Sequence, residues 1–223
     1  PGAVRSPTWP MSTWDFHTRK GSRAVCCSIV VANLLLHTCC GPCATYSVEE
    51  WRRKGLEVAA LWYNPNIHPW HEFILRREGM VDLARSLELP LDIQEGQVTD
   101  YFRRVGRDRV GRCAHCFSLR LGETARAARE WGLDAFSTTL LISPYQKHEL
   151  LQEVAEEVSR RYKVRFLYRD LRPGYQRSRQ LARQHGLYRQ KHCGCIYSLR
   201  ERLSGMQVRD DGTPVVARKV APR

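Results

Sequence analysis

The sequence lacks any apolar run long enough to cross a bilayer, and it also lacks internal repeats and low-complexity tracts. Its longest largely apolar stretch, residues 24–36, falls short of the roughly 20 residues that a membrane-spanning helix needs. Mean hydropathy is -0.47 and 43% of the residues are apolar, which is typical of a soluble globular protein. We therefore expect no membrane partner, and the 223 residues suit one sizeable core.

Acidic residues are scarce, since 23 Asp and Glu stand against 36 Lys and Arg and the net charge is +13. Most of the basic residues are Arg, whose planar guanidinium suits phosphate better than the point charge of Lys does. Such a surface favours a polyanion, because binding releases condensed counterions. A basic surface without a partner is the alternative, and charge alone does not decide between the two.

Short apolar segments alternate with longer amphipathic ones from residue 34 onward. Residues 58–63 form a continuous apolar run, as expected for a strand covered on both faces, and residues 148–162 place apolar side chains on one helical face. The alternation predicts an α/β fold, with a doubly wound parallel sheet and helices on both faces. The expected strands are 34–37, 58–63, 91–93, 135–142 and 164–168, and the expected helices are 46–54, 72–88, 113–131, 148–162 and 176–185.

Basic residues followed by the apolar run 24–36 resemble a signal peptide, but the run lacks a persuasive small-x-small cleavage site before His37. We therefore interpret the end of that run as the first core strand. Cys26 and Cys27 are expected to be incidental or simply buried. The expected segments are an extension that is disordered or non-native, a single α/β domain and a polar C-terminal tail, over residues 1–31, 32–205 and 206–223.

A Gly-rich phosphate loop is missing after the first expected strand, where Cys39-Cys40-Gly-Pro-Cys43 stands instead. This absence argues against an ATP-pyrophosphatase activity. In a parallel sheet, ligands bind beyond the carboxyl ends of the strands. Residues that follow other strands, namely Asn64-Pro-Asn66, Ser143-Pro144 and Asp170, are therefore expected to line the same edge.

Nine cysteines are present, and seven of them fall into three tight groups. A secreted disulfide framework is usually shorter, with dispersed cysteines in an even number. The grouping is typical of metal or redox sites in a reducing compartment, so we expect a cytoplasmic protein. The groups are Cys39-Cys40-Gly-Pro-Cys43, Cys113-Ala-His-Cys116 and Cys193-Gly-Cys195.

The spacing of Cys113 and Cys116 lets both sulfurs reach one metal, which permits half of a zinc site, half of a cluster or a redox dithiol. Adjacent cysteines such as Cys39 and Cys40 suit a polynuclear cluster better than a zinc knuckle, whose ligands are about two to four residues apart. The four thiolates together match the complement of a [4Fe–4S] centre. The alternative is that Cys39 or Cys40 is a packed core thiol.

Cys193 and Cys195 enclose one Gly, which lets the backbone bend until the two sulfurs meet. A disulfide in so small a ring is strained and labile, as a reversible two-electron dithiol requires. Metal ligation by one or both sulfurs is the competing interpretation. Lys191 and His192 could depress a thiol pKa or deliver a proton. Cys43 could cap a helix, ligate a further metal or pack in the core.

Five longer motifs occur in order between residues 33 and 203, and several of them are too long to arise by chance. They are His37-Thr-Cys-Cys-Gly-Pro-Cys43, Trp62-Tyr-Asn-Pro-Asn-Ile67 with Glu72, Arg112-Cys-x-x-Cys116 with Arg120, Phe136-Ser-Thr-Thr-Leu-Leu-Ile-Ser-Pro-Tyr-Gln146 and Tyr188-Arg-Gln-x-x-Cys-Gly-Cys-x-Tyr-Ser198. Together the motifs resemble the QueH-type epoxyqueuosine reductase family.

The resemblance implies a HUP-like α/β fold and an oxidoreductase of tRNA processing in queuosine biosynthesis. Such an enzyme removes the epoxide oxygen of epoxyqueuosine, at the wobble position of the tRNA anticodon, as water. The partners implied are tRNA carrying epoxyqueuosine and an electron donor that the sequence does not identify. The residues implied are Cys39, Cys40, Cys113 and Cys116 as ligands of a [4Fe–4S] cluster, Cys193 and Cys195 as a redox-active disulfide pair, and Cys43, Cys193, Cys195 or Asp170 for an additional iron.

A structural zinc-binding, RNA-associated module is the main alternative function, and it predicts a colourless protein without redox chemistry. Sulfur transfer to tRNA is a third hypothesis, but it usually requires nucleotide activation, for which the phosphate loop is missing. Candidate proton donors are Tyr145, His148 and His192. Trp62, Tyr63 and Tyr145 could stack on an extruded base, with packing in the core as the alternative.

Overall fold

The computed structural model describes residues 33–106, 108, 110–208 and 214–216, with side chains up to residue 205. The hypotheses on residues 1–31, including Cys26 and Cys27, lie outside these residues. Within the described ranges, no helix combines the length and the apolar character that crossing a membrane requires.

The centre of the fold is one sheet of five parallel strands in the order β3-β2-β1-β4-β5. The central strand β1 pairs with β2 on one side and with β4 on the other, so that Leu35 faces Ala59 and Phe136 in register. The strands are β1 (Asn33–His37), β2 (Glu57–Trp62), β3 (Leu91–Ile93), β4 (Ala135–Thr138) and β5 (Arg165–Phe166). The predicted doubly wound parallel sheet is confirmed, with the strand order of dinucleotide-binding halves.

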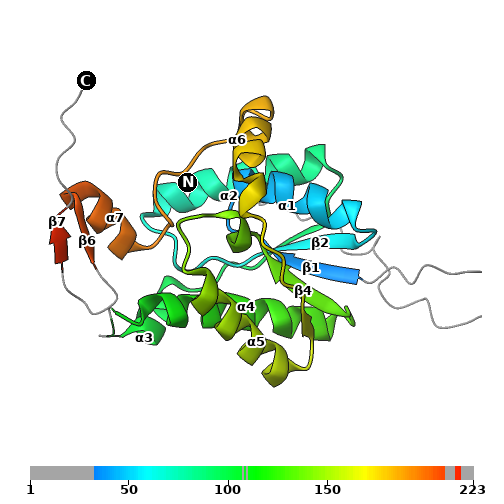
Figure 1. Ribbon diagram of the computed structural model, residues 1–223, viewed down its shortest axis with the longest axis horizontal. Coiled ribbons are helices and arrows are strands. Elements are labelled where there is room, and N and C mark those ends of the chain that lie inside the picture. The colour runs from blue at the N-terminus through cyan, green and yellow to red at the C-terminus, as the bar shows by residue number, and fades with distance from the viewer. Residues whose placement is uncertain (1–32, 107, 109, 209–213, 217–223) are drawn as a thin grey trace, which may run out of the picture. The chain divides into compact units, whose positions relative to one another are not determined.

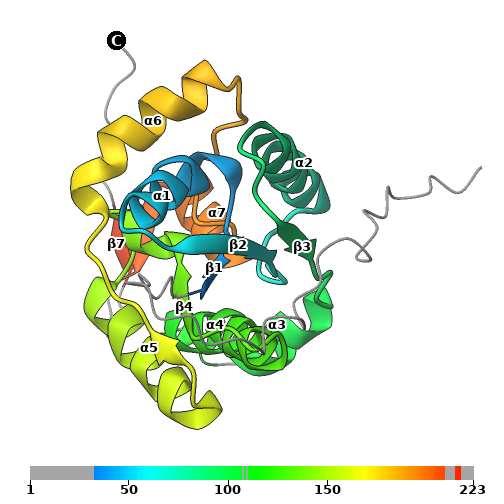
Figure 2. The same cartoon turned by 90° about the vertical axis from the view of Figure 1, so that its right-hand side faces the viewer.

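Helices cover both faces of this sheet. Figure 2 shows α1, α2 and α6 on one face and α3, α4 and α5 on the other, while Figure 1 shows α7 on the side toward which β1 runs. The carboxyl ends of the strands therefore lie on the side of α7. The helices are α1 (Gly41–Arg53), α2 (Trp70–Ser86), α3 (Val98–Val105), α4 (Arg112–Glu130), α5 (His148–Tyr162), α6 (Tyr175–Gln184) and α7 (Ile196–Ser204).

The core has two halves because β1 is buried on both faces. Leu34 and Leu36 pack in a cluster with apolar residues of α1 and α2. Leu35 points to the opposite face, where it packs in a second cluster with residues of α4 and α5. Both halves bury their apolar residues almost completely, which makes β1 a rigid support for the residues that follow it.

The predicted strand 135–142 is wrong in its second half, since β4 ends at Thr138 and a 3-10 helix, Thr139–Ile142, follows. The Thr138 side chain accepts a hydrogen bond from the backbone N of Leu140 at 3.1 Å, and this cap turns the chain out of the strand.

The other differences concern helix boundaries and the end of the chain. The basic stretch before Trp131 forms two helices, α3 and α4, and α1 begins at Gly41 rather than near Tyr46. The helix α7 and the antiparallel strands β6 (Met206–Val208) and β7 (Pro214–Val216) were not predicted.

Candidate active site

Cys39, Cys40 and Cys43 form a compact group of thiols at the carboxyl end of β1. Their sulfur atoms all lie within 4.8 Å of one another, and the Sγ atoms of Cys39 and Cys40 are 3.7 Å apart. All three side chains are buried. The group forms because α1 begins immediately after Cys40, with Pro42 in its first turn, so that the first turn brings Cys43 back beside the adjacent pair.

Two neutral side chains from distant segments contact these thiols. The hydroxyl of Thr139 lies 3.3 Å from the sulfur of Cys39 and also accepts the backbone N–H of Cys39. The amide of Gln190 donates to the sulfur of Cys40 at 2.9 Å and approaches the sulfur of Cys43 at 3.7 Å. Sequence reasoning assigned no role to Gln190 or Thr139, although both lie inside the motifs that it singled out.

The three thiols do not ionise alike. Hydrogen bonds from Cys40 and Cys43 lower the pKa of the Cys39 thiol well below its usual value, against the opposing effect of burial. Burial raises the pKa of Cys40, and the hydrogen bonds to Cys39 and Cys40 raise that of Cys43. The group therefore favours a single thiolate on Cys39, which two neighbouring S–H groups stabilise.

Arg120 is a buried cation next to the thiols, with 3% of its surface exposed. Its guanidinium donates to His37 Nε2 at 3.3 Å, to Asn64 Oδ1 at 2.7 Å and to the sulfur of Cys116 at 3.8 Å. Burial, and then the charge of Arg120, lower the pKa of His37 to about 3, so this ring is neutral. The guanidinium also lowers the pKa of Cys39. Sequence reasoning placed Arg120 in a motif but did not anticipate its burial.

Cys113 and Cys116 lie in the first turn of α4. Cys113 is partly buried against the apolar cluster that contains Cys39, Cys40 and Cys43, whereas Cys116 is buried with Cys195 in a small neighbouring cluster. Burial raises the pKa of both thiols, that of Cys116 to about 11. The CxxC segment thus borders both of the other cysteine groups, and its sharing of a metal with Cys39 and Cys40 stays a prediction.

Cys193 and Cys195 lie on a tight loop before α7, with their sulfur atoms 3.6 Å apart. Gly194 has φ +118, a backbone conformation that residues with a side chain rarely adopt. This turn brings the two thiols to the same side. Cys193 is exposed and Cys195 is buried. The sulfur of Cys195 accepts from the thiol of Cys193 and from the backbone N of Ser198 at the start of α7, and these hydrogen bonds lower its pKa to about 4.

A buried ion pair on α2 holds this loop. Arg76 donates to the carbonyl oxygens of Cys193 and His192 at 3.1 Å and 3.0 Å, and it pairs with Glu72 at 2.6 Å. The hydroxyl of Tyr188 donates to the other carboxylate oxygen of Glu72 at 2.6 Å. These contacts fix the backbone of the loop that carries Cys193 and Cys195, and they do not involve the two sulfur atoms.

The remaining candidates divide by exposure. Trp62 is fully buried and Tyr63 is 9% exposed, so the alternative of core packing applies to both, whereas Tyr145 is 83% exposed. His192 Nε2 contacts the carbonyl oxygen of His68 at 3.3 Å. Asp170 is engaged by Arg172 at 2.7 Å, and this contact lowers its pKa to about 2.

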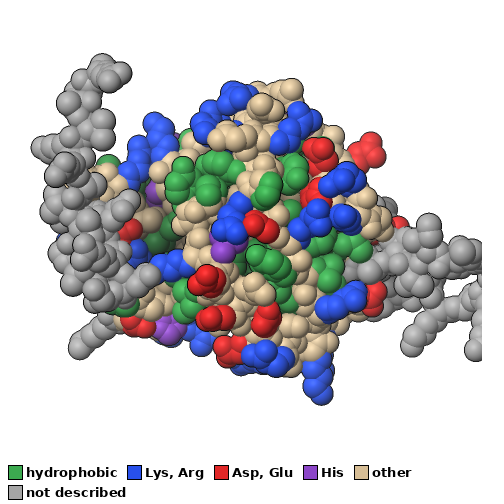
Figure 3. Space-filling model, in the orientation of Figure 1, with side chains coloured by type: hydrophobic (Ala, Val, Ile, Leu, Met, Phe, Trp, Pro, Cys, Tyr) green, Lys and Arg blue, Asp and Glu red, His purple; other side chains and the backbone are tan. Residues whose placement is uncertain are grey.

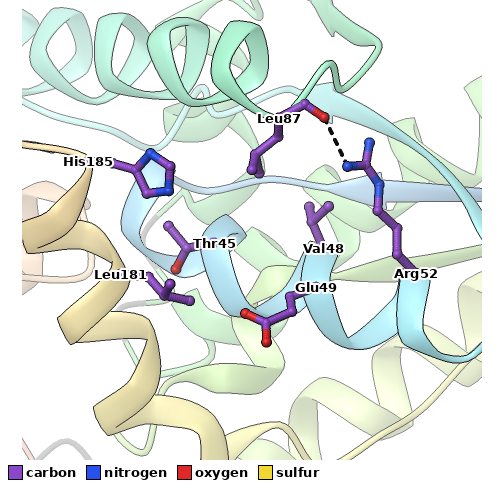
Figure 4. Close-up of a pocket in the computed structure, with 7 residues that line it drawn as sticks. All are labelled: Thr45, Val48, Glu49, Arg52, Leu87, Leu181 and His185. Atoms are coloured by element: carbon purple, nitrogen blue, oxygen red, sulfur yellow. Dashed lines mark hydrogen bonds between the residues drawn. The ribbon is translucent and has the colours of Figure 1, made fainter.

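A hollow of about 300 Å³ lies away from all of the described cysteines, between α1, the end of α2 and α6 (Figure 4). Arg52 donates to the carbonyl oxygen of Leu87 at its rim. None of the candidate site residues described above lines this hollow. Its lining residues are Thr45, Val48, Glu49, Arg52, Leu87, Leu181 and His185.

The donor set of the thiol group fits a soft metal centre. Three converging buried thiols with a stabilised thiolate and a nearby cation, and with no carboxylate in the group among the residues that the structure describes, suit iron–sulfur clusters or zinc and disfavour hard cations. Because Cys39 and Cys40 are adjacent in the chain, they favour an iron–sulfur cluster over zinc.

The chain was compared with known proteins. The family model described as "Epoxyqueuosine reductase QueH" matches residues 34–201. The protein named epoxyqueuosine reductase QueH from Dehalococcoides mccartyi is 43% identical over 76% of this chain and 93% of its own length, and the one from Thermotoga maritima is 33% identical over 77% and 93%. A predicted subunit of tRNA methyltransferase from Methanocaldococcus jannaschii has a solved structure with a TM-score of 0.47 and 12% identity, over 69% of this chain and 75% of that one.

Proposed function

The chain belongs to the QueH family of epoxyqueuosine reductases, and we propose on this basis that it reduces epoxyqueuosine in tRNA to queuosine. The observation that carries the proposal is the junction between the two sulfur groups. Gln190 lies three residues before the dithiol and donates to the sulfur of Cys40, while Cys195 packs with Cys116. These contacts support a single site in which the proposed redox dithiol lies beside the proposed metal-binding thiol group.

The proposed reaction balances with the dithiol as the two-electron donor. Cys193 and the Cys195 thiolate are oxidised to a disulfide, which releases two electrons and the one proton of Cys193, and water supplies a second proton. The epoxide accepts the two electrons and the two protons, its two C–O bonds break, a carbon–carbon double bond forms and the oxygen leaves as water. A reductant outside the chain must then return the disulfide to the dithiol.

The residues around the dithiol suit this role. Cys195 holds a thiolate at the start of α7, where the helix N-terminus and the Ser198 N–H stabilise negative charge. Cys193 is exposed and holds the proton, so it is the thiol that can meet a substrate. Arg76 fixes the loop carbonyls, which keeps the two sulfurs close in both redox states. His192 is half-buried, and burial lowers its pKa, so it is neutral beside the pair.

We propose that Cys39, Cys40, Cys113 and Cys116 hold a [4Fe–4S] cluster, with Cys43 free to ligate an additional iron. Bound there, the cluster supplies one-electron transfer between an external donor and the dithiol. Arg120 offsets negative charge at this position, and the hydrogen bonds of Thr139 and Gln190 orient the sulfurs. The cysteine usage supports a reducing, cytoplasmic compartment.

Anaerobic purification followed by iron and sulfide assay, and turnover on tRNA bearing epoxyqueuosine with a chemical reductant, tests the proposal. We expect iron, sulfide and loss of the epoxide oxygen. Cys193→Ser and Cys195→Ser should abolish turnover and keep the visible absorption of the cluster, whereas Cys40→Ser should lose both. A colourless protein that retains zinc and leaves the epoxide intact would support the zinc module instead.

A further inference from the structure

Residues 171–200 form a segment of one charge. They contain seven Lys or Arg and no Asp or Glu, and they run from the end of the sheet through α6 to the dithiol and α7. Several arginines elsewhere pair with carboxylates, as Arg126 does with Glu123 and Glu130 on α4. Across the part of the chain that the structure describes, no ion pair ties the arginines of α6 to a carboxylate. Their charge is available to an outside anion.

The inner face of α6 rests on the thiol loop. Ser178 donates its hydroxyl to the carbonyl oxygen of Pro42, between Cys40 and Cys43, at 2.7 Å. The contact is close because Gly174 precedes the helix, where an added Cβ would lie 2.0 Å from a ring carbon of Tyr46. The register of α6 on the site is therefore set by direct packing.

This register aligns Tyr175, Arg179 and Arg183 in a row that leads away from the cysteines. The three residues are spaced at i, i+4 and i+8, so they lie on one side of the helix at steps of about 6 Å. Tyr175 packs against the cluster of Cys39, Cys40 and Cys43, and Arg183 is exposed. The row begins at the site and ends in solvent.

An exposed aromatic ring lies next to Tyr175, the first residue of the row. Tyr145 follows the 3-10 helix after β4, is 83% exposed, and meets the ring of Tyr175 edge to face with centroids 6.1 Å apart. An exposed ring supported by a second ring offers a flat surface for stacking. Aromatic rings next to arginines form the surface that binds single-stranded nucleic acid.

The two parts of this face differ in charge. Lys and Arg side chains flank its upper part over α6, while its lower part, where α5 lies, carries Asp and Glu side chains together with further Lys and Arg side chains (Figures 1 and 3). The helix α5 carries four Glu and also Arg160 and Arg161 in its last turn, whereas α6 carries three Arg and no carboxylate. A polyanion is therefore attracted more strongly to α6 than to α5.

We propose that Tyr145 and the row Tyr175, Arg179 and Arg183 bind the anticodon loop of the tRNA, with an unstacked base on Tyr145 and successive phosphates on the two arginines. The inference rests on the proposed function for the identity of the RNA. It adds the surface and the direction in which the strand leaves the site. Single-stranded loops are the RNA regions whose bases are free to stack on aromatic side chains.

Fluorescence anisotropy of a labelled anticodon stem-loop RNA, with the full chain, tests this surface. We expect Arg179→Gln combined with Arg183→Gln to weaken binding by roughly tenfold or more, and to reduce the slope of log affinity against log salt by about 1.4. Tyr145→Leu should weaken binding by about 5- to 150-fold, and Tyr145→Phe should not. Arg126→Gln, which removes an arginine already paired on α4, is the matched control and should bind like the wild type.

Turnover on tRNA bearing epoxyqueuosine separates this inference from the proposed function. If the wild type reduces the epoxide while the row variants keep its affinity and salt slope, the surface is wrong and the function stands. If the wild type leaves the epoxide intact while the row variants lose RNA affinity, the surface stands and the function is wrong. Tighter binding to phosphatidylserine vesicles than to the RNA, lost in the same variants, would overturn the proposed partner.

Discussion

The guanidinium of Arg120 lies 3.8 Å from the sulfur of Cys116, buried and without any carboxylate partner among the described residues. Its other contacts are a neutral His37 and the amide of Asn64. A buried cation is costly unless an opposite charge compensates it. The thiolate that the site favours on Cys39 supplies that charge, so Arg120 is a buried counter-ion for the thiols.

Replacing Arg120 should alter the thiols even in metal-free protein. We expect Arg120→Gln to raise the pKa of Cys116 further, because the nearby positive charge that opposes the effect of burial is lost. In the iron-loaded protein, the same change should lower the reduction potential of the proposed cluster, since the more negative reduced state loses a counter-ion. A pH titration of thiolate absorbance and a potentiometric titration measure the two effects.

Arg120→Lys is the control for this prediction, because it keeps the charge and loses part of the hydrogen bonding. It should restore most of the potential. A potential that is unchanged in Arg120→Gln would show that the charge does not act on the centre.

Arg76 should matter for stability and for the dithiol at once. Arg76→Ala leaves Glu72 buried without its cation and frees the carbonyl oxygens of Cys193 and His192. We expect a loss of about 3 to 5 kcal/mol in the free energy of unfolding, measured by urea denaturation. Glu72→Gln should cost less, since the amide still accepts from Arg76 and contacts Tyr188. Additive effects in the double variant would contradict a shared clamp.

The α/β alternation was predictable because buried parallel strands and amphipathic helices have distinct periodicities. The helix α7 was not, since it has only nine residues and none of those is buried. The end of β4 depends on one hydrogen bond of Thr138 inside an uninterrupted run of Thr, Leu and Ile. No local pattern marks such a stop.

The grouping of cysteines was predictable from their spacing, but the convergence of Cys43 with Cys39 and Cys40 was not. It depends on α1 beginning at Gly41, several residues before the predicted start. The burial of Arg120 and the contact of Gln190 with Cys40 are tertiary contacts between distant segments. A charged or amide side chain in a helix or loop gives no sequence signal that it faces inward.

Gly194 should tolerate no side chain. Its φ is +118, and an added Cβ would lie 3.1 Å from Nη1 of Arg76 and 3.1 Å from Cγ1 of Ile67. We expect Gly194→Ala to destabilise the fold by about 1 to 3 kcal/mol and to slow turnover by displacing the loop. Gly186→Ala is the matched control, because Gly186 also has a positive φ but its Cβ would meet nothing within 4 Å. If Gly186→Ala slowed turnover as much as Gly194→Ala, backbone strain alone would explain the effect, without a displaced loop.

The ionisation of Cys195 makes the free energy of unfolding depend on pH. The hydrogen bonds from Cys193 and Ser198 lower its native pKa to about 4, whereas an unfolded cysteine has a pKa of about 8.5. Below pH 4 the thiol is protonated in both states and contributes nothing. Between these values only the native state is ionised, so the free energy of unfolding of metal-free, reduced protein should rise with pH.

Urea denaturation at a series of pH values, with Cys195→Ser beside the wild type, measures this contribution as the difference between the two curves. The difference should grow from about pH 4 upward and level off near pH 8.5. Cys193→Ala should shrink it, because this change removes the thiol that donates to the sulfur of Cys195 in the wild type. A difference that is constant across the whole range would mean that Cys195 stays protonated, and its proposed role as the resident thiolate would have to pass to Cys193.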